Sequence, residues 1–295
     1  MIKPTINAIS LILITIFATI YCITRLYDIS LEPVFRSNNK NRNWLISFAE
    51  GLAHESNQNF LNASSINKGF DNIITYGPKD IDQKYYEQHK DILSQKRGAG
   101  YWLWKPYLIK KTMSLMAEGD VLFYVDTGAT LLTNTDFFIN QMDKAEASVL
   151  LFKSYHKNER YTKRDTYSLM GMDEKYRDYP QIGATFIILR KSKRSEAFID
   201  AFLKYCEDPQ ILTDSKSTLG EYEDFIDHRN DQSIITLLYY QDPTGILLMN
   251  YHDKGVCDKF FHHRRRAFGV SLEWLYYIYQ YGGGMCNEMN FTASR

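Results

Sequence analysis

Residues 98–131 constrain the fold more than any other part of this chain. They begin with an aromatic stretch, continue into a predicted helix with Pro106 in its first turn, and finish in the apolar run 121–125 followed by Asp126. A strand that is apolar at every position is typical of a sheet covered by helices on both faces. Such sheets bind ligands at the carboxyl ends of their strands, where Asp126 stands. The alternative is that Asp126 only caps the turn that follows the strand.

Strand-like and helix-like segments alternate along the rest of the sequence. The pattern predicts strands at residues 44–49, 72–76, 121–125, 147–152 and 184–190, and helices at 54–63, 81–95, 106–118, 136–144, 192–205 and 234–240. This alternation indicates an α/β fold with a mixed, mostly parallel sheet flanked by helices.

A polar and aromatic stretch between residues 153 and 180 interrupts this pattern. It is too long for a simple connection between a strand and a helix. We expect this insertion either to cover or form a binding site or to be a solvated surface excursion.

The N-terminal residues 5–24 contain no charged side chain. At about 1.5 Å per residue, a helix of this length reaches roughly the 30 Å of a hydrocarbon core. We therefore predict a transmembrane anchor within residues 1–27, a polar stem in 28–43 and a folded domain in 44–295, which makes this a single-pass membrane protein with an N-terminal signal-anchor. A cleaved signal peptide is the alternative.

The membrane and the orientation of the anchor stay open. Cations that follow the apolar run favour a cytoplasmic domain, whereas Asn62 and Asn290 are formal glycosylation acceptors that require a lumenal one. A bacterial inner membrane and the Golgi or endoplasmic reticulum are both compatible with the sequence.

Composition excludes one class of partner. The 295-residue chain has 35 basic and 35 acidic residues and a formal net charge of zero, which argues against nucleic acid. Its four cysteines show neither the paired spacing of a zinc site nor a disulfide framework. Other partners must be inferred from individual sites.

Two acidic residues suit chemistry on a nucleotide-activated sugar, which needs a cation beside the diphosphate and a group that accepts the acceptor's proton. We expect Asp126 to hold the donor diphosphate, directly or through a divalent ion. Lys105 or the arginines of residues 264–266 would add positive charge. Asp231 is the candidate base on the acceptor side, although its carboxylate also suits a helix cap.

Aromatic and polar neighbours complete the candidate site. We expect Trp102 and Trp104 to line the donor pocket together with Lys105; the alternative is that both indoles pack under the following helix. Gln232 is a hydrogen-bonding neighbour of the candidate base.

Three separated blocks of sequence resemble a known family. They are RGAGYWLWKPYLI at residues 97–109, GDVLFYVDTGA at 119–129 and DFIDHRNDQS at 224–233. Together they look like bacterial capsular-polysaccharide type glycosyltransferases with the GT-A, nucleotide-diphospho-sugar transferase fold, and the similarity covers about residues 44–270. The resemblance implies a nucleotide-sugar donor and a glycan or lipid-linked acceptor.

The candidate residues then have the following expected roles, of which the resemblance itself implies that of Asp126. Asp126 takes the position of the first acid of the Asp-X-Asp metal motif, and Asp231 shares the catalytic role with it. The substrate-binding residues are then Trp102, Trp104, Lys105, Tyr124, Gly128, His228, Arg229 and Gln232. The second acid of the motif is replaced by Gly128, so dependence on Mn²⁺ or Mg²⁺ is open, with His262 or His263 as further candidate ligands.

Two other classes compete with a transferase. The run Asp126-Thr127-Gly128 also resembles the active-site loop of retroviral-type aspartic proteases, which need two such carboxylates and a small all-β domain. A membrane-anchored sugar-binding protein without catalytic activity would explain the missing second acid.

Overall fold

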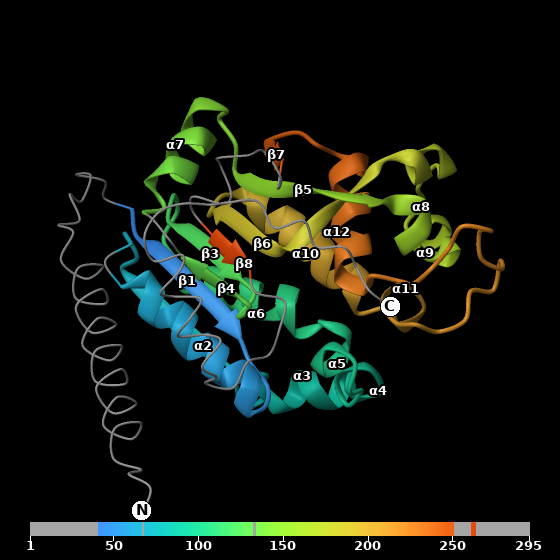
Figure 1. Ribbon diagram of the computed structural model, residues 1–295, viewed down its shortest axis with the longest axis horizontal. Helices are drawn as coiled ribbons and strands as arrows, with labels where there is room; N and C mark the ends of the chain where they lie inside the picture. The colour runs from blue at the N-terminus through green and yellow to red at the C-terminus, as the bar shows by residue number, and fades with distance from the viewer. Residues whose placement is uncertain (1–40, 67, 132–133, 251–260, 264–295) are drawn as a thin grey trace, which may run out of the picture.

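Six strands form the central sheet of the chain, of which the computed structural model describes residues 41–66, 68–131, 134–250 and 261–263 (Figure 1). Their order across the sheet is β2 (Asn72–Tyr76), β1 (Asn43–Phe48), β3 (Val121–Val125), β6 (Pro180–Arg190), β5 (Val149–Lys157) and β7 (Ile246–Asn250). Strand β6 runs antiparallel to both β3 and β5, whereas the other pairings are parallel. The prediction of a mixed, mostly parallel sheet is confirmed.

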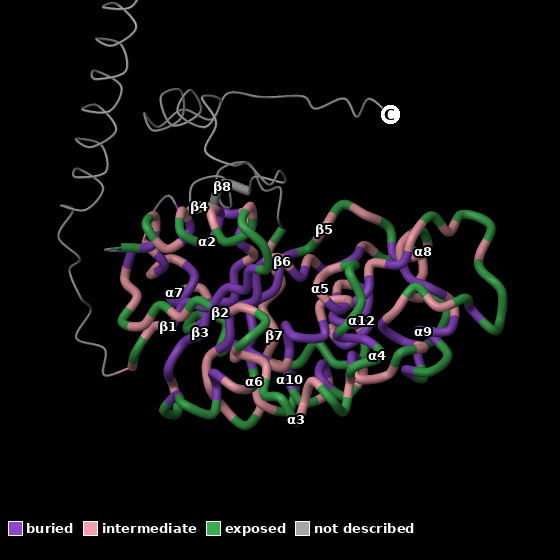
Figure 2. The backbone as a smooth tube through the Cα atoms, turned by 90° about the horizontal axis from the view of Figure 1, so that it is seen from below, coloured by how far each residue is buried: buried purple, intermediate pink, exposed green. Residues whose placement is uncertain are grey.

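Helices cover both faces of this sheet. Leu122 and Tyr124 of β3 pack in one core with α6 (Trp104–Met113), α10 (Lys193–Cys206) and α12 (Asn230–Gln241). Phe123 packs in a second core with α2 (Leu52–Ser65) and α7 (Asp136–Lys144). Figure 2 shows buried residues along the strands of the sheet and also around α9 and α12. Because side chains alternate along a strand, Asp126 continues the row of Leu122 and Tyr124 toward α6 and α12.

Most predicted elements have the expected type, and β2, β3 and α7 also have the predicted bounds. The helix predicted at residues 81–95 is divided into α3 (Gln83–Gln88) and α4 (Lys90–Leu93), preceded by the short helix η1 (Pro78–Asp80). The break lies at His89, whose φ of −121° and ψ of 29° are not helical. The sequence does not reveal this break, because its amphipathic pattern continues across His89, whose backbone is not helical.

The polar insertion is more regular than its sequence suggests. Strand β5 extends through residue 157, beyond the predicted end, and is followed by α8 (Asn158–Tyr161), α9 (Arg164–Leu169) and η2 (Glu174–Asp178) before β6 begins at Pro180. The outer half of β5 alternates between exposed and partly buried residues and shows irregular register with β6, which hides its strand character in the sequence. Because Asn158, Lys163 and Tyr167 of this segment are buried, the insertion packs on the fold and is not a simple solvated excursion.

A two-stranded sheet follows the turn after Asp126. Strand β4 (Ala129–Leu131) pairs antiparallel with β8 (Phe261–His263), in a register that places Ala129 opposite His263. This pairing places residues 261–263 beside strand β4, which begins three residues after Asp126.

The predicted anchor at residues 5–24 and nearly all of the predicted stem at 28–43 lie outside the described residues. Among the residues that the structure does describe, no helix combines the length and the hydropathy that crossing a membrane requires.

The segment labelled α5 (Gly98–Tyr101) is a left-handed turn (Figure 1). All five residues from Gly98 to Trp102 have positive φ, at 58°, 53°, 95°, 52° and 61°. A left-handed conformation costs roughly 1–2 kcal/mol for each residue with a Cβ, and such strain persists only where the surroundings enforce it. Here the indole Nε1 of Trp104 donates to the Gly98 carbonyl at 2.9 Å.

The two glycines make this turn sterically feasible, and we predict that Gly100→Ala is much more destabilising than Gly171→Ala. A Cβ at Gly100 would lie 2.7 Å from the Leu93 Cα, whereas a Cβ at Gly171 meets nothing within 4 Å, although its φ is also positive at 65°. We expect about 1 kcal/mol for Gly171→Ala from backbone strain alone and at least about 3 kcal/mol for Gly100→Ala. Urea unfolding measures both; equal losses would contradict the predicted close packing at Gly100.

Candidate active site

The side chain of Lys105 is the centre of the candidate site. It belongs to the first turn of α6, is 2% exposed, and donates to the Ala184 carbonyl of β6 at 3.1 Å and to Oδ2 of Asp231 in a short hydrogen bond. Its Nζ lies 3.7 Å from Oδ1 of Asp126. The two predicted acids, Asp126 directly after β3 and Asp231 in α12, are thus brought together by one buried ammonium group.

Burial and charge set the protonation of this cluster. Burial alone would lower the pKa of Lys105, but the carboxylates of Asp126 and Asp231 outweigh it and raise that pKa. Burial raises the pKa of the Asp231 carboxyl, and the ammonium group of Lys105 offsets part of this effect. Lys105 therefore stays protonated at neutral pH, because an uncharged amine would leave two neighbouring carboxylates without a counter-charge.

Asp126 differs from its neighbours in being accessible. Its side chain is 33% exposed, compared with 7% for Asp231. The Tyr124 hydroxyl donates to Oδ1 of Asp126 at 2.5 Å, and burial followed by the Asp126 charge raises the pKa of Tyr124 well above its ordinary value. Since the Asp126 side chain binds these partners, it does not merely cap the turn after β3. Asp126 presents a fixed carboxylate at the carboxyl edge of the sheet.

The two predicted tryptophans have different environments. Trp104 is buried and stacks on Phe48 with ring centroids 3.9 Å apart, so for this residue the packing alternative is confirmed. Trp102 is partly buried within the left-handed turn, and its ring covers the Cα of Gly98. Gly128 lies in the turn between β3 and β4 and is partly buried. The role of Trp102 and Gly128 in substrate binding stays a prediction.

Three predicted binding residues lie around the start of α12. His228 is 2% exposed; its Nδ1 accepts from the Lys163 N–H at 3.2 Å and its Nε2 donates to the Ile211 carbonyl at 2.9 Å. The guanidinium group of Arg229 lies 4.2 Å from the Tyr161 ring centroid. Gln232 donates to the Gln181 side chain at 2.6 Å. Both ring nitrogens of His228 serve the backbone, which indicates a structural role.

Lys105 is not available to a donor diphosphate in this conformation. Its ammonium hydrogens face the Ala184 carbonyl and the two carboxylates, and the side chain is buried. From the sequence, Lys105 is one of two candidate sources of positive charge for the diphosphate, and its inward orientation cannot be foreseen.

The described residues do not by themselves form a divalent-cation site. Among them, no group of three His, Cys, Asp or Glu side chains has a metal-binding arrangement. A divalent ion prefers several oxygen ligands, and here the exposed Asp126 carboxylate already faces an ammonium group. The backbone register of β8 places His262 and His263 opposite Thr130 and Ala129, so their role as ligands stays a prediction.

Arg97 is a residue near the site that the sequence alone does not reveal. Its guanidinium Nη2 donates to Asp227 at 2.9 Å and to the His228 carbonyl at 3.1 Å, and its Nε lies 3.2 Å from Asp214. This residue opens the first sequence block, RGAGYW, but nothing local reveals carboxylate partners more than 100 residues away.

We predict that Lys105→Met destabilises the protein by about 3–5 kcal/mol, the usual cost of leaving a buried charge without its partner. Adding Asp231→Asn should recover most of this loss, because it removes the buried carboxylate that Lys105 neutralises. Urea unfolding of wild type, both single variants and the double variant gives the coupling energy. Additive losses in the double variant would show that the two side chains do not stabilise each other.

We also predict a pH-dependent contribution from His228. Burial lowers its pKa from 6.5 to about 3, so the unfolded chain binds a proton that the folded protein does not as the pH falls from 6.5 toward 3. This contribution to stability is present above pH 6.5 and is lost below it, with a total of about 4–5 kcal/mol.

The variant His228→Gln isolates this effect. It should be less stable than wild type at pH 7.5, and the difference should narrow as the pH falls to 4.5, because all other titrating groups are shared. Urea unfolding at four pH values measures the difference. If it stayed constant with pH, His228 would not be neutral in the folded protein.

Comparison with known proteins gives structural similarity only. No family model and no curated protein sequence matches the chain. Three solved structures that align with the fold are glycosyltransferases. Mouse xyloside xylosyltransferase 1 in its apo form is 9% identical, with 72% of this chain and 85% of that chain covered and a TM-score of 0.42. A glycosyltransferase involved in glycosylation of the major capsid of PBCV-1 is 6% identical, with 76% and 95% covered and a TM-score of 0.45, and the galactosyltransferase LgtC with donor and acceptor sugar analogs is 13% identical, with 70% and 73% covered and a TM-score of 0.38. Because these TM-scores lie below 0.5, the function proposed below is argued from the site.

Proposed function

We propose that this protein is a glycosyltransferase that moves a sugar from a nucleotide-sugar donor to a glycan or lipid-linked acceptor. The observation that carries the proposal is the accessible carboxylate of Asp126 at the carboxyl edge of the sheet, held by Tyr124 and Lys105. Ligands of open α/β sheets bind at this edge. The three sequence blocks that suggested the function contribute Lys105, Asp126 and Asp231 to one cluster.

The charges of the cluster suit the donor-sugar end of such a substrate. Two carboxylates and one ammonium group leave an excess negative charge, and the exposed part of it lies on Asp126. Glycosyl transfer develops positive charge on the sugar ring as the bond to the diphosphate breaks. A carboxylate fixed in advance stabilises such charge without reorganisation. The diphosphate itself needs a cation from elsewhere, because Lys105 is turned inward.

Asp126 and Asp231 then have separate roles. We assign substrate contact to Asp126, which is the more exposed of the two side chains. Asp231 fixes the position of Lys105 and through it the electrostatic environment of Asp126. The proposal that Asp231 takes the acceptor's proton would require its pair with Lys105 to open.

The aspartic protease does not fit the fold. Such enzymes are small all-β domains in which two carboxylates share a proton, whereas Asp126 ends a strand of an α/β sheet and faces an ammonium group. A sugar-binding protein without activity remains the second candidate, and the following experiment separates it from a transferase.

We predict that the full chain releases free nucleotide from at least one member of a panel of nucleotide sugars, and that Asp126→Ala lowers this rate at least about 100-fold. Asp178→Ala, an exposed acid in η2, is the matched control and should keep the wild-type rate. Assays with Mn²⁺ and with EDTA give the metal dependence, and thermal shift gives nucleotide binding.

Full activity of Asp126→Ala would contradict the proposed site. A thermal shift with a nucleotide and no release from any donor would favour the binding protein. If the protein showed no thermal shift and released no nucleotide, both candidates would be excluded.

A further inference from the structure

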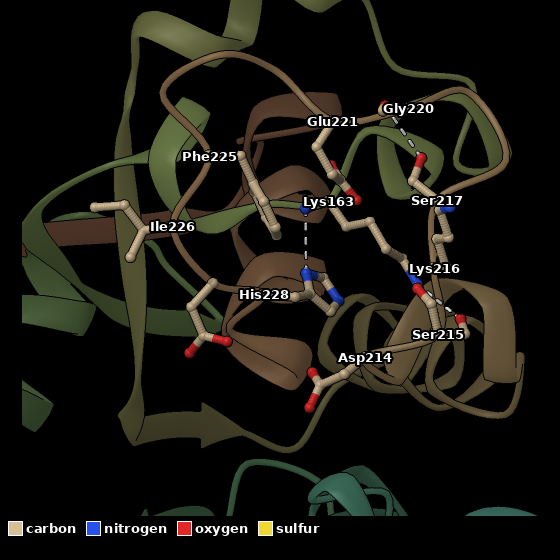
Figure 3. Close-up of a pocket in the computed structure, with 11 residues that line it drawn as sticks. Lys163, Asp214, Ser215, Lys216, Ser217, Gly220, Glu221, Phe225, Ile226 and His228 are labelled. Atoms are coloured by element: carbon tan, nitrogen blue, oxygen red, sulfur yellow. Dashed lines mark hydrogen bonds between the residues drawn. The ribbon is translucent and has the colours of Figure 1, made fainter.

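A cavity lies beside the start of α12, in the loop that follows the short helix α11 (Pro209–Leu212) (Figure 3). It has a volume of about 370 Å³, within the range typical of ligand pockets. Residues 214–228 supply most of its lining, and Lys163, which immediately precedes α9, supplies the rest. None of the predicted site residues except His228 belongs to it.

The loop around this pocket is held in place from the polar insertion. The Lys163 ammonium group donates to the Thr213 carbonyl at 2.9 Å and to the carbonyl and hydroxyl of Ser215 at 3.1 and 3.0 Å. Asp165 accepts from the Ser217 hydroxyl at 2.6 Å and from the Thr218 N–H at 2.8 Å. The shape of the pocket is thus fixed before any ligand binds, which reduces the entropic cost of binding.

The same loop is joined to both parts of the candidate active site. Arg97, which precedes the left-handed turn, pairs with Asp214 and Asp227. Asn230, which precedes Asp231, donates to the Leu212 carbonyl at 2.7 Å and to Asp214 at 3.1 Å. The pocket therefore adjoins the cluster of Lys105 and Asp231 along the chain and through these contacts.

The lining favours a hydroxyl-rich ligand over an anion. Three carboxylates and two lysines line the pocket, and the three donor bonds of Lys163 are used within the protein. In Figure 3 the side chains of Glu221 and Phe225 both point toward Lys163 and His228. Carboxylate oxygens accept hydrogen bonds from hydroxyl groups, and an aromatic ring packs against an apolar face. A pyranose ring offers both.

We propose that this pocket is the acceptor subsite and binds a pyranose unit of an acceptor glycan. Glu221 accepts hydrogen bonds from the sugar hydroxyls and Phe225 packs against the apolar face of the ring. This inference rests on the proposed function, and it narrows the acceptor to a saccharide.

The test compares donor hydrolysis with transfer in the full chain. With the donor found in the nucleotide screen, methyl pyranosides of common hexoses are assayed as acceptors, and ligand-observed NMR measures their binding directly. One of them should bind and accelerate nucleotide release. Glu221→Gln and Phe225→Ala should each raise its KM about tenfold, as expected for one lost contact to a charged or apolar group.

Asp224→Asn is the matched control, because Asp224 is exposed and lies outside the pocket lining, and its KM should equal that of wild type. Unchanged KM in both pocket variants, or no binding of any methyl pyranoside by NMR, would overturn the assignment. If no donor releases nucleotide, the transferase proposal fails, and NMR binding that is lost in Phe225→Ala would still assign a saccharide to the pocket.

Discussion

The candidate site depends on the pairing of the Lys105 ammonium group with the carboxylates of Asp126 and Asp231. This ammonium group lies between β3, β6 and α12 and neutralises two carboxylates in an interior where separate charges are costly. The three elements must therefore meet with defined geometry, because a shift of any one would leave a buried charge without its partner. The same pairing fixes the one acid of the cluster that solvent and ligands reach, Asp126.

The carboxyl edge of the sheet gathers the features that suit a binding site. The left-handed turn follows β2, Asp126 follows β3, and the insertion that holds the pocket loop follows β5. Figure 1 shows α3, α4, α5, α8 and α9 toward the end of the sheet to which β1 and β5 point. Arg97 links the left-handed turn to the pocket loop through its ion pairs with Asp214 and Asp227, and these ion pairs help to hold the strained backbone of the turn in place. A substrate that spans Asp126 and the pocket would contact segments from all three connections.

The local sequence predicts those elements that have a regular burial pattern, either buried at every position or along one face. The uninterrupted apolar run of β3 and the polar-apolar period of α7 gave their bounds, and the acid after β3 was expected at a sheet edge. Long-range pairing could not be foreseen: Lys105 was expected to face a diphosphate and instead faces Asp231, 126 positions away. Arg97 and its partners in the pocket loop were missed for the same reason. The two glycines of GAG indicate a turn, but the conformation of that turn depends on the close approach of Gly100 to Leu93 and on the hydrogen bond from Trp104 to Gly98.

The central claim is that a nucleotide sugar binds with its donor sugar against Asp126 while Lys105 remains buried beneath it. A crystal structure of the full chain with the nucleotide sugar that gives the largest thermal shift tests this most directly. The account predicts the ligand at the carboxyl end of β3, within contact of the Asp126 carboxylate, and Lys105 still paired with Asp231. A nucleotide bound at another edge of the sheet, or Lys105 turned outward onto the phosphates, would contradict it.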